Sequence, residues 1–213
     1  MRVILASKSP ARLDTLRSAG IYPDVVVSGV DEEGITADTI PELTRARAQL
    51  KGQAVLGRLE LDEVVEAGTT IILACDSLLE VAGQTFGKPG TEAAAIARWY
   101  RLRGQRGILH TGHHVIVVAG DGSSQSATRV ASTTVTFADL TDAEIAAYAA
   151  TGEPQRVAGA FTLDGHGGAF VTRIEGDPHN VVGISLPLVR QMLLDLGISW
   201  TSLWAPIVPR EDD

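Results

Sequence analysis

Cysteine and positive charge are both scarce in this sequence of 213 residues. Cys75 is its single cysteine, so no intrachain disulfide and no cysteine-based zinc site can form. Lysine and arginine number 18 against 26 acidic residues, which gives a formal net charge of −8. A general nucleic-acid binder needs a broad basic surface, so this balance argues against polymeric nucleic acid as a partner. A few cations focused in one cleft can still bind a small phosphorylated ligand.

Long hydrophobic runs are missing as well. The first six residues are too short an apolar run for a signal peptide, and no stretch approaches the roughly 20 residues that span a bilayer. A single cysteine suits a reducing compartment, so we expect a cytoplasmic protein without membrane contact. Hydrophobic residues make up 45% of the chain, which is enough for a core. The length fits one large domain or two tightly joined lobes.

Several common catalytic motifs are also absent. The sequence contains no Gly-x-x-x-x-Gly-Lys-Ser/Thr loop and no His-Glu-x-x-His pair, so it is neither a P-loop enzyme nor a zincin. Its five histidines have no clear ligand spacing, and three of them fall in or beside a predicted strand, where packing roles are expected.

Strand–helix units alternate with one long hairpin. A Ser-Pro or Thr cap, or a proline at the first turn, predicts helices beginning near Ser9, Pro41, Thr91 and Thr141, and a last helix covers residues 186–196. The second helix carries a predicted apolar stripe of Leu43, Ala46, Leu50 and Ala54, and Gly165–Gly168 is predicted to be a flexible loop. Strands are expected over residues 3–6, 25–27, 70–74, 111–118, 127–137 and 169–174. This order predicts an α/β protein with a mixed, twisted sheet flanked by helices.

Polar residues that could bind phosphate follow the first predicted strand. Ser7, Ser9 and Arg12 lie where a turn opens a helix, and backbone N–H groups at a helix start favour anions. The arginine fork suits phosphate oxygens. The same pattern also fits an ordinary capped helix with an exposed arginine.

Carboxylates and lysines stand at further junctions. Residues 31–33 are a run of acids with the hard oxygen ligands that Mg²⁺ and Mn²⁺ prefer. Asp76 directly follows an apolar strand, where it could hold a metal or accept a proton from water. Lys88 is fixed between Gly87 and Pro89, and Lys51 borders the apolar stripe of its helix. Each residue alone also fits a role without function in binding or catalysis: a solvated acidic loop, an aspartate in a turn or a surface lysine.

Taken together and in order, these segments resemble the Maf family, also called septum-formation inhibitor proteins or nucleoside triphosphate pyrophosphatases. The resemblance runs from about residue 3 to residue 196. Several blocks in the right order are far more specific than any one of them. The matching blocks are 5–10 (LASKSP), 30–32 (VDE), 48–51 (AQLK), 74–76 (ACD), 87–89 (GKP), 133–137 (TTVTF), 148–153 (YAATGE), 158–161 (AGAF) and 180–183 (NVVG).

The resemblance implies an elongated α/β fold with a central cleft between two lobes, and often a homodimer. We expect one such domain over residues 1–205, with a mobile tail at 206–213. The resemblance also implies hydrolysis of nucleoside triphosphates, among them modified or non-canonical ones, to the monophosphate and pyrophosphate with Mg²⁺ or Mn²⁺. Such activity would sanitise the nucleotide pool, and the family is linked to arrest of cell division.

The resemblance also assigns roles to individual positions. Asp76 corresponds to the catalytic proton acceptor, and Glu32 to its partner in the metal site. Four residues correspond to phosphate contacts: Ser7, Arg12, Lys51 and Lys88.

Three positions distinguish the branches of the family with known base preference, and this sequence fits neither branch at all three. Ala11 stands where the uracil/thymine-directed branch has a second arginine, and Asp164 where that branch has glutamine, whereas Ser77 matches it. The branch acting on 7-methylguanine has a bulky residue, Gln and Glu at these places, so the sequence indicates a third branch. A carboxylate only accepts hydrogen bonds, so Asp164 would suit a base edge rich in N–H donors, such as guanine. It would equally serve as a turn cap before Gly165.

Two other functions remain open on sequence grounds. One is an inosine or xanthosine triphosphate pyrophosphatase, which cleaves the same bond in other nucleotides. The other is a non-catalytic regulatory protein that acts in septum formation by binding a partner. A set of carboxylates and cations suited to metal and phosphate speaks against a purely binding role.

Overall fold

A computed structural model describes residues 1–32 and 34–204 of the chain, except for the side chains of residues 61 and 62. Residue 33 of the acidic run and the tail expected at 206–213 lie outside the described residues. No helix in the described part is both long and apolar enough to cross a membrane.

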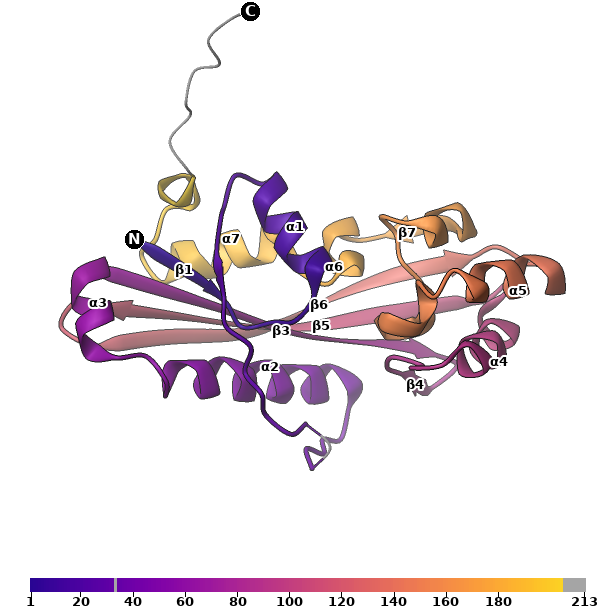
Figure 1. Cartoon of the computed structure of the whole chain (residues 1–213), viewed down its shortest axis with the longest axis horizontal. Helices are drawn as coiled ribbons and strands as arrows, with labels where there is room; N and C mark the ends of the chain where they lie inside the picture. The colour runs from indigo at the N-terminus through magenta and orange to yellow at the C-terminus, as the bar shows by residue number, and fades with distance from the viewer. Residues whose placement is uncertain (33, 205–213) are drawn as a thin grey trace, which may run out of the picture.

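One mixed sheet of seven strands organises the molecule (Figure 1). Its order is β2-β1-β3-β5-β6-β7, with β4 paired to β3. β1 runs parallel to both of its neighbours, and the other pairings are antiparallel. The strands are β1 (Arg2–Leu5), β2 (Asp24–Val25), β3 (Thr69–Val81), β4 (Gln84–Phe86), β5 (Arg106–Ala119), β6 (Ser124–Phe137) and β7 (Val171–Glu175).

Helices cover both faces of this sheet, so the prediction of an α/β protein with a mixed sheet and flanking helices is confirmed. α2 lies along one face, whereas α1, α6 and α7 lie along the other (Figure 1). α3 stands at one end of the sheet and packs into the same apolar cluster as α2. α4 and α5 gather at the far end of the long strands. The helices of the described residues are α1 (Pro10–Ser18), α2 (Ile40–Leu56), α3 (Leu61–Ala67), α4 (Glu92–Leu102), α5 (Asp142–Ala150), α6 (Pro178–Val182) and α7 (Leu186–Asp195). Short 3-10 helices are η1 (Pro154–Arg156), η2 (Ala158–Ala160), η3 (His166–Phe170) and η4 (Trp200–Leu203).

Strand β3 is much longer than expected. The sequence predicted that it ends at Ala74, so that Asp76 follows the strand, and this prediction was wrong. Its ladder with β5 continues without a break from Thr69 to Glu80, which places Asp76 inside the strand. The predicted second strand is also shorter in the structure and begins one residue earlier, at Asp24.

The buried face of α2 differs from the predicted stripe. Leu50 is exposed, and the predicted stripe is at most half-buried. Small residues, not leucines, allow the helix backbone to approach β5 closely: a Cβ atom on Gly112 of β5 would lie 2.2 Å from the carbonyl oxygen of Thr44. The buried positions of α2 are Thr44, Ala48, Gly52 and Val55.

The segment Gly165–Gly168 is also more regular than the predicted loop. Most of it belongs to η3, and Gly167 is buried. Helix α3 was not predicted at all.

Apolar residues form clusters at both ends of β3 and leave a polar middle. Near its start, Ile71 and Leu73 join a cluster with α1 and α7, while Ile72 and Ala74 join another beneath α2 and α3. Near its end, Leu79 and Val81 join the cluster around the fully buried Trp99 of α4, which we call the Trp99 cluster. Asp76 and Ser77 lie between these cores.

The close approach of α2 to β5 predicts the effect of a single methyl group. We expect Gly112→Ala to lower the free energy of unfolding by about 1–3 kcal/mol, because the added Cβ would meet backbone atoms that cannot move aside. Urea unfolding followed by circular dichroism measures this. Gly34→Ala is the matched control, since a Cβ there meets nothing within 4 Å. Equal unfolding midpoints for the two variants would contradict the role assigned to Gly112.

Candidate active site

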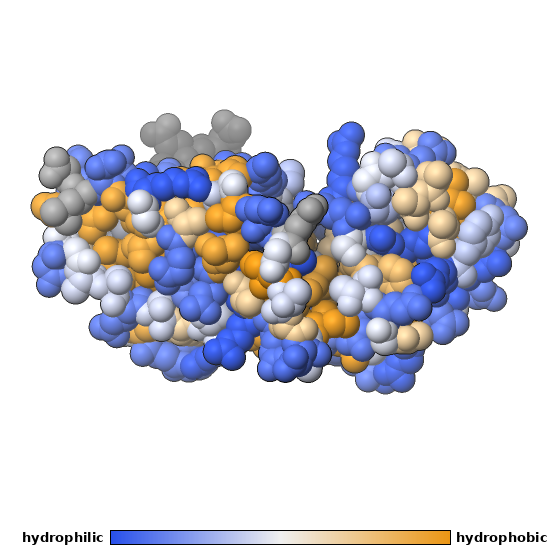
Figure 2. Space-filling model, turned by 90° about the horizontal axis from the view of Figure 1, so that it is seen from below, coloured by the Kyte–Doolittle hydropathy of each residue, from blue (hydrophilic) through white to orange (hydrophobic). Residues whose placement is uncertain are grey.

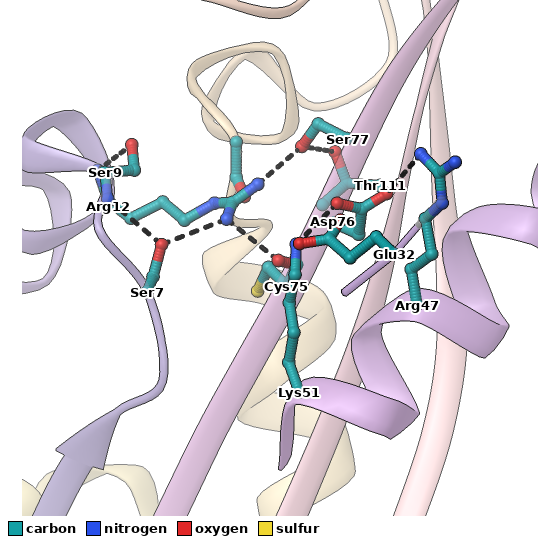
Figure 3. A network of polar contacts seen from close by, with 11 residues as sticks. Ser7, Ser9, Arg12, Glu32, Arg47, Lys51, Cys75, Asp76, Ser77 and Thr111 are labelled. Carbon is teal, nitrogen blue, oxygen red and sulfur yellow. Dashed lines mark hydrogen bonds and ion pairs between the residues drawn. The ribbon is translucent and has the colours of Figure 1, made fainter. Parts of the chain in front are cut away.

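Asp76 is the centre of a charged cluster on the α2 side of the sheet (Figure 3). Lys51 of α2 donates from Nζ to Asp76 Oδ1 at 2.6 Å and lies 3.0 Å from Glu32 Oε1. The lysine therefore joins the two carboxylates that the sequence paired. Asp76 is only 7% exposed, and burying a carboxylate requires such a partner.

Arg12 is held by protein acceptors on nearly every side. Its Nε donates to the carbonyl of Gly183 at 2.7 Å, and one terminal nitrogen donates to Ser7 Oγ at 3.1 Å and to the carbonyl of Cys75 at 2.8 Å. The other terminal nitrogen donates to Ser77 Oγ at 2.9 Å. Four of the five N–H groups of a guanidinium are thus used inside the protein. The open fork expected for phosphate is not present.

Ser77 continues this network away from Arg12. Its Oγ lies 2.9 Å from Thr111 Oγ1, which in turn donates to the carbonyl of Asn180 at 3.3 Å. Because that carbonyl can only accept, the proton of Thr111 is committed to it, and Ser77 must donate to Thr111. Ser77 thus accepts from Arg12 and donates to Thr111. Its hydroxyl proton is therefore not available for a hydrogen bond to the base of a nucleotide.

Arg47 is a member of the cluster that sequence reasoning missed. One of its terminal nitrogens lies 4.0 Å from Asp76 Oδ2, too far for a hydrogen bond but close enough for charge attraction. Among the described residues, both Asp76 Oδ2 and Arg47 Nε are buried without a hydrogen-bond partner. Arg47 precedes Lys51 by one helical turn, so the i,i+4 spacing was the available signal.

Lys88 approaches the cluster from the turn after β4. Burial lowers the pKa of its ammonium, the positive charges of Arg12 and Lys51 lower it further, and Glu32 and Asp76 oppose them. Lys88 therefore lies close enough to these four charged residues for them to shift its pKa. The turn is fixed to the far end of the sheet, because the carbonyl of Gly87 accepts from Arg98 and from the backbone of Gly159.

The two remaining specificity candidates lie apart from these contacts. Ala11 is half-buried in the first turn of α1, and Asp164 is exposed between η2 and η3. Within the described residues, no hydrogen bond or ion pair joins Asp164 to Asp76, Glu32 or Lys51. The structure therefore brings together Ser7, Arg12, Ser77, Glu32, Lys51 and Asp76, with Lys88 close by.

Glu153 organises the segment that carries Asp164. Its carboxylate accepts hydrogen bonds from the hydroxyls of Tyr148 at 2.8 Å and Thr162 at 2.5 Å, and from the backbone of His166 and Gly167 at 3.0 Å each. Burial favours the protonated carboxyl, but the hydrogen bonds from Thr162, His166 and Gly167 outweigh it and hold the pKa of Glu153 at about 2. A single carboxylate thus ties this segment to α5.

Two other reactive side chains near the cluster are inert. Burial raises the pKa of the Cys75 thiol to about 11, so it is no nucleophile at neutral pH. Burial also lowers the pKa of His113 to about 4, and its ring accepts from the backbone of Ser185 at 2.8 Å. The histidine is therefore neutral and structural.

The donor set fits a hard divalent cation that is completed by a substrate. No group of three or more histidine, cysteine or acidic residues in the described part could hold a metal by itself. Mg²⁺, however, is usually held by one or two carboxylates together with substrate phosphates. Asp76 supplies a buried oxygen that has no hydrogen-bond partner among the described residues, and Glu32 lies nearby, 3.0 Å from the ammonium of Lys51.

A buried carboxylate with two cations of α2 beside it thus lies in the middle of the long strand β3. Seen from the α2 side of the sheet, the outline of the molecule has a notch between its two ends (Figure 2). The profile of the Maf family (Maf-like protein) matches residues 2–196, and the chain belongs to that family.

Named relatives agree with this assignment. A protein of Cutibacterium acnes named nucleoside triphosphate pyrophosphatase is 54% identical over 94% of this chain and 93% of its own length. One of Salinispora tropica with the same name is 54% identical over 96% of this chain and 88% of its own length. Among solved structures, a dITP/XTP pyrophosphatase of Mycobacterium abscessus aligns at 14% identity over 66% of this chain and 76% of its own, with a TM-score of 0.32; this likeness supports no conclusion.

The low pKa of Glu153 predicts how acid affects stability. Its stabilising contribution is complete above the ordinary glutamate pKa of about 4.3 and is lost as the pH falls through about 2. We expect Glu153→Gln to lower the free energy of unfolding at pH 7 by about 1–2 kcal/mol and to weaken the dependence of stability on pH between 5 and 2. Chemical denaturation at a series of pH values measures both effects.

The control for this experiment is Glu66→Gln, which changes an exposed carboxylate on α3. It should keep the acid dependence of the wild type. A Glu153→Gln variant with the same steep loss of stability would show that Glu153 is not the group responsible.

Proposed function

We propose that this protein hydrolyses nucleoside triphosphates to the monophosphate and pyrophosphate, with a divalent metal, Mg²⁺ or Mn²⁺. The observation that carries the proposal is the buried Asp76. Its Oδ1 accepts from Lys51, whereas its Oδ2 lies 4.0 Å from Arg47 and has no hydrogen-bond partner in the described structure. The common name of the relatives at about half identity supports the same reaction.

The carboxylates and cations would divide the chemical work. Asp76 and Glu32 would hold the metal, which when bound would offset phosphate charge and polarise the P–O bonds. Asp76 would also accept a proton from the water that attacks the α-phosphorus. Lys51 and Lys88 would bind phosphate oxygens and stabilise the charge that develops on the leaving pyrophosphate. Ser7 and Arg12 would contribute mainly by shaping this site, since most of their polar atoms are used within the protein.

Base selection is the finer part of the proposal. Asp164 presents an acceptor only, so it would favour a base edge with N–H donors, such as guanine, over the carbonyls of thymine and uracil. Ala11 leaves out a positive charge that a related branch of the family carries at this position. Much faster turnover of dTTP than of any guanine nucleotide would refute this preference.

The cellular setting of the reaction also stays a proposal. We infer one domain of two lobes, a cytoplasmic location and a homodimer, with a role in sanitising the nucleotide pool and a link to cell division. The single cysteine supports the cytoplasmic location, and membership of the family supports the other inferences.

A nucleotide panel tests the reaction. We expect release of pyrophosphate together with monophosphate from canonical and modified nucleoside triphosphates, dependent on Mg²⁺ or Mn²⁺. Asp76→Asn should lower kcat at saturating metal by at least about 100-fold, because a general base contributes this much. Steady-state kinetics with separate detection of phosphate and pyrophosphate measures it.

The outcomes separate the competing functions. Orthophosphate as sole inorganic product would mean that a different bond is cut. No turnover of any nucleotide with either metal would favour a binding protein. Near-full activity of Asp76→Asn would remove the general-base role.

A further inference from the structure

We propose that Arg47 is a substrate-binding residue that binds the polyphosphate end of the nucleotide, the part released as pyrophosphate. This inference rests on the proposed function. It assigns the bidentate phosphate contact to α2, and not to Arg12 at the start of α1.

Arg47 lies beside Asp76, on the side away from Lys51 (Figure 3). One terminal nitrogen is 4.0 Å from Asp76 Oδ2. The side chain is 21% exposed, so it is partly shielded from water yet reachable. The cluster thus has a second arginine whose contact with the protein, among the described residues, is a long ion pair and no hydrogen bond.

The donors of Arg47 contrast with those of the other cations. Arg12 donates four hydrogen bonds to protein acceptors, and Lys51 forms ion pairs with two carboxylates. In contrast, Arg47 Nε is buried and has no hydrogen-bond partner in the described part of the chain. A buried donor without a partner is costly, and a bound ligand that accepts from it removes that cost.

The geometry of the guanidinium then specifies the ligand class. Nε and a terminal nitrogen form one planar edge with two parallel N–H groups, which matches two oxygens of a phosphoryl group. The terminal nitrogen near Asp76 Oδ2 is Nη1, so a phosphoryl group bound at the edge formed by Nε and Nη2 would reach Asp76, where the metal is expected, across the width of the guanidinium. Arg47 and the metal would therefore hold the same polyphosphate from two sides.

The competing explanation is that Arg47 only offsets the charge of Asp76. In that case it would act on the carboxylate and leave the affinity for phosphate unchanged. Product inhibition separates the two explanations, because pyrophosphate and the monophosphate occupy different parts of the site.

The experiment compares Arg47→Met and Arg47→Lys with the wild type and with Arg45→Met at saturating Mg²⁺. Arg45 is an exposed arginine of the same helix and serves as the matched control. Thermal melts and circular dichroism first establish that each variant is folded. The readouts are kcat, KM for the best nucleotide, and inhibition constants for pyrophosphate and for the corresponding monophosphate.

We expect Arg47→Met to raise KM and the inhibition constant of pyrophosphate at least about tenfold, as when an ionised hydrogen bond is lost. The inhibition constant of the monophosphate should stay within twofold. Arg47→Lys should recover only part of the loss, because it keeps the charge but not the fork. Arg45→Met should behave as the wild type does.

Two results would overturn the inference. One is an unchanged inhibition constant of pyrophosphate in Arg47→Met together with a shifted pH–rate profile, which is the signature of an effect on Asp76 alone. The other is an equal loss for pyrophosphate and monophosphate. If the wild type turns over no nucleotide, the proposed function fails, and calorimetric binding of Mg²⁺–pyrophosphate to wild type and Arg47→Met still decides the role of Arg47.

Discussion

The burial of one carboxylate in the middle of a long strand is the constraint on which the rest of the site depends. Asp76 is 7% exposed within β3, and an ionised group at such a depth is stable only beside opposite charge. Lys51 supplies that charge at 2.6 Å, and Arg47 adds to it from 4.0 Å. Both come from α2, so the position of this helix decides whether the site can exist.

The packing of α2 follows from the same constraint. A helix that faced the sheet with leucines would stand further from β5, and its lysine would not reach a carboxylate rooted in the neighbouring strand. Thr44, Ala48 and Gly52 bring the backbone close, and Gly112 on β5 leaves room for it. At this interface the helix does without large apolar side chains, and its backbone can therefore lie close to the sheet. The clusters at the two ends of β3 provide the bulk of the core.

The close packing of α2 through small residues explains which features could be predicted from the sequence and which could not. Caps and apolar runs mark elements well, so the mixed sheet, the long hairpin and the helices opened by Ser9, Thr91 and Thr141 were predictable. The apolar stripe of α2 was wrong because the periodicity argument assumes that large residues face the core. Asp76 appeared to end a strand because an isolated charge in a β segment usually does so.

Individual site residues show the same limit. Lys51, Asp76 and Glu32 were recognisable from their blocks, and the structure joins them through one ammonium group. Arg47 carried no motif of its own, although it lies one helical turn from Lys51. The role of Ser77 could not be predicted either, since the direction of its hydrogen bond depends on Thr111 and on the carbonyl of Asn180, 69 residues beyond Thr111.

The cations of the site consequently serve different purposes, although the sequence presents them as equivalent. Arg12 is buried, and its donors hold together β3, the end of α6 and the turn after β1, so its charge reaches a ligand as a fixed field and not through a fork. Lys51 neutralises the two carboxylates. Lys88 is exposed on the turn after β4, and Arg47 on α2 has a buried Nε without a hydrogen-bond partner in the described part of the chain. A polyphosphate bound between them would be held from the far end of the sheet by one and from α2 by the other.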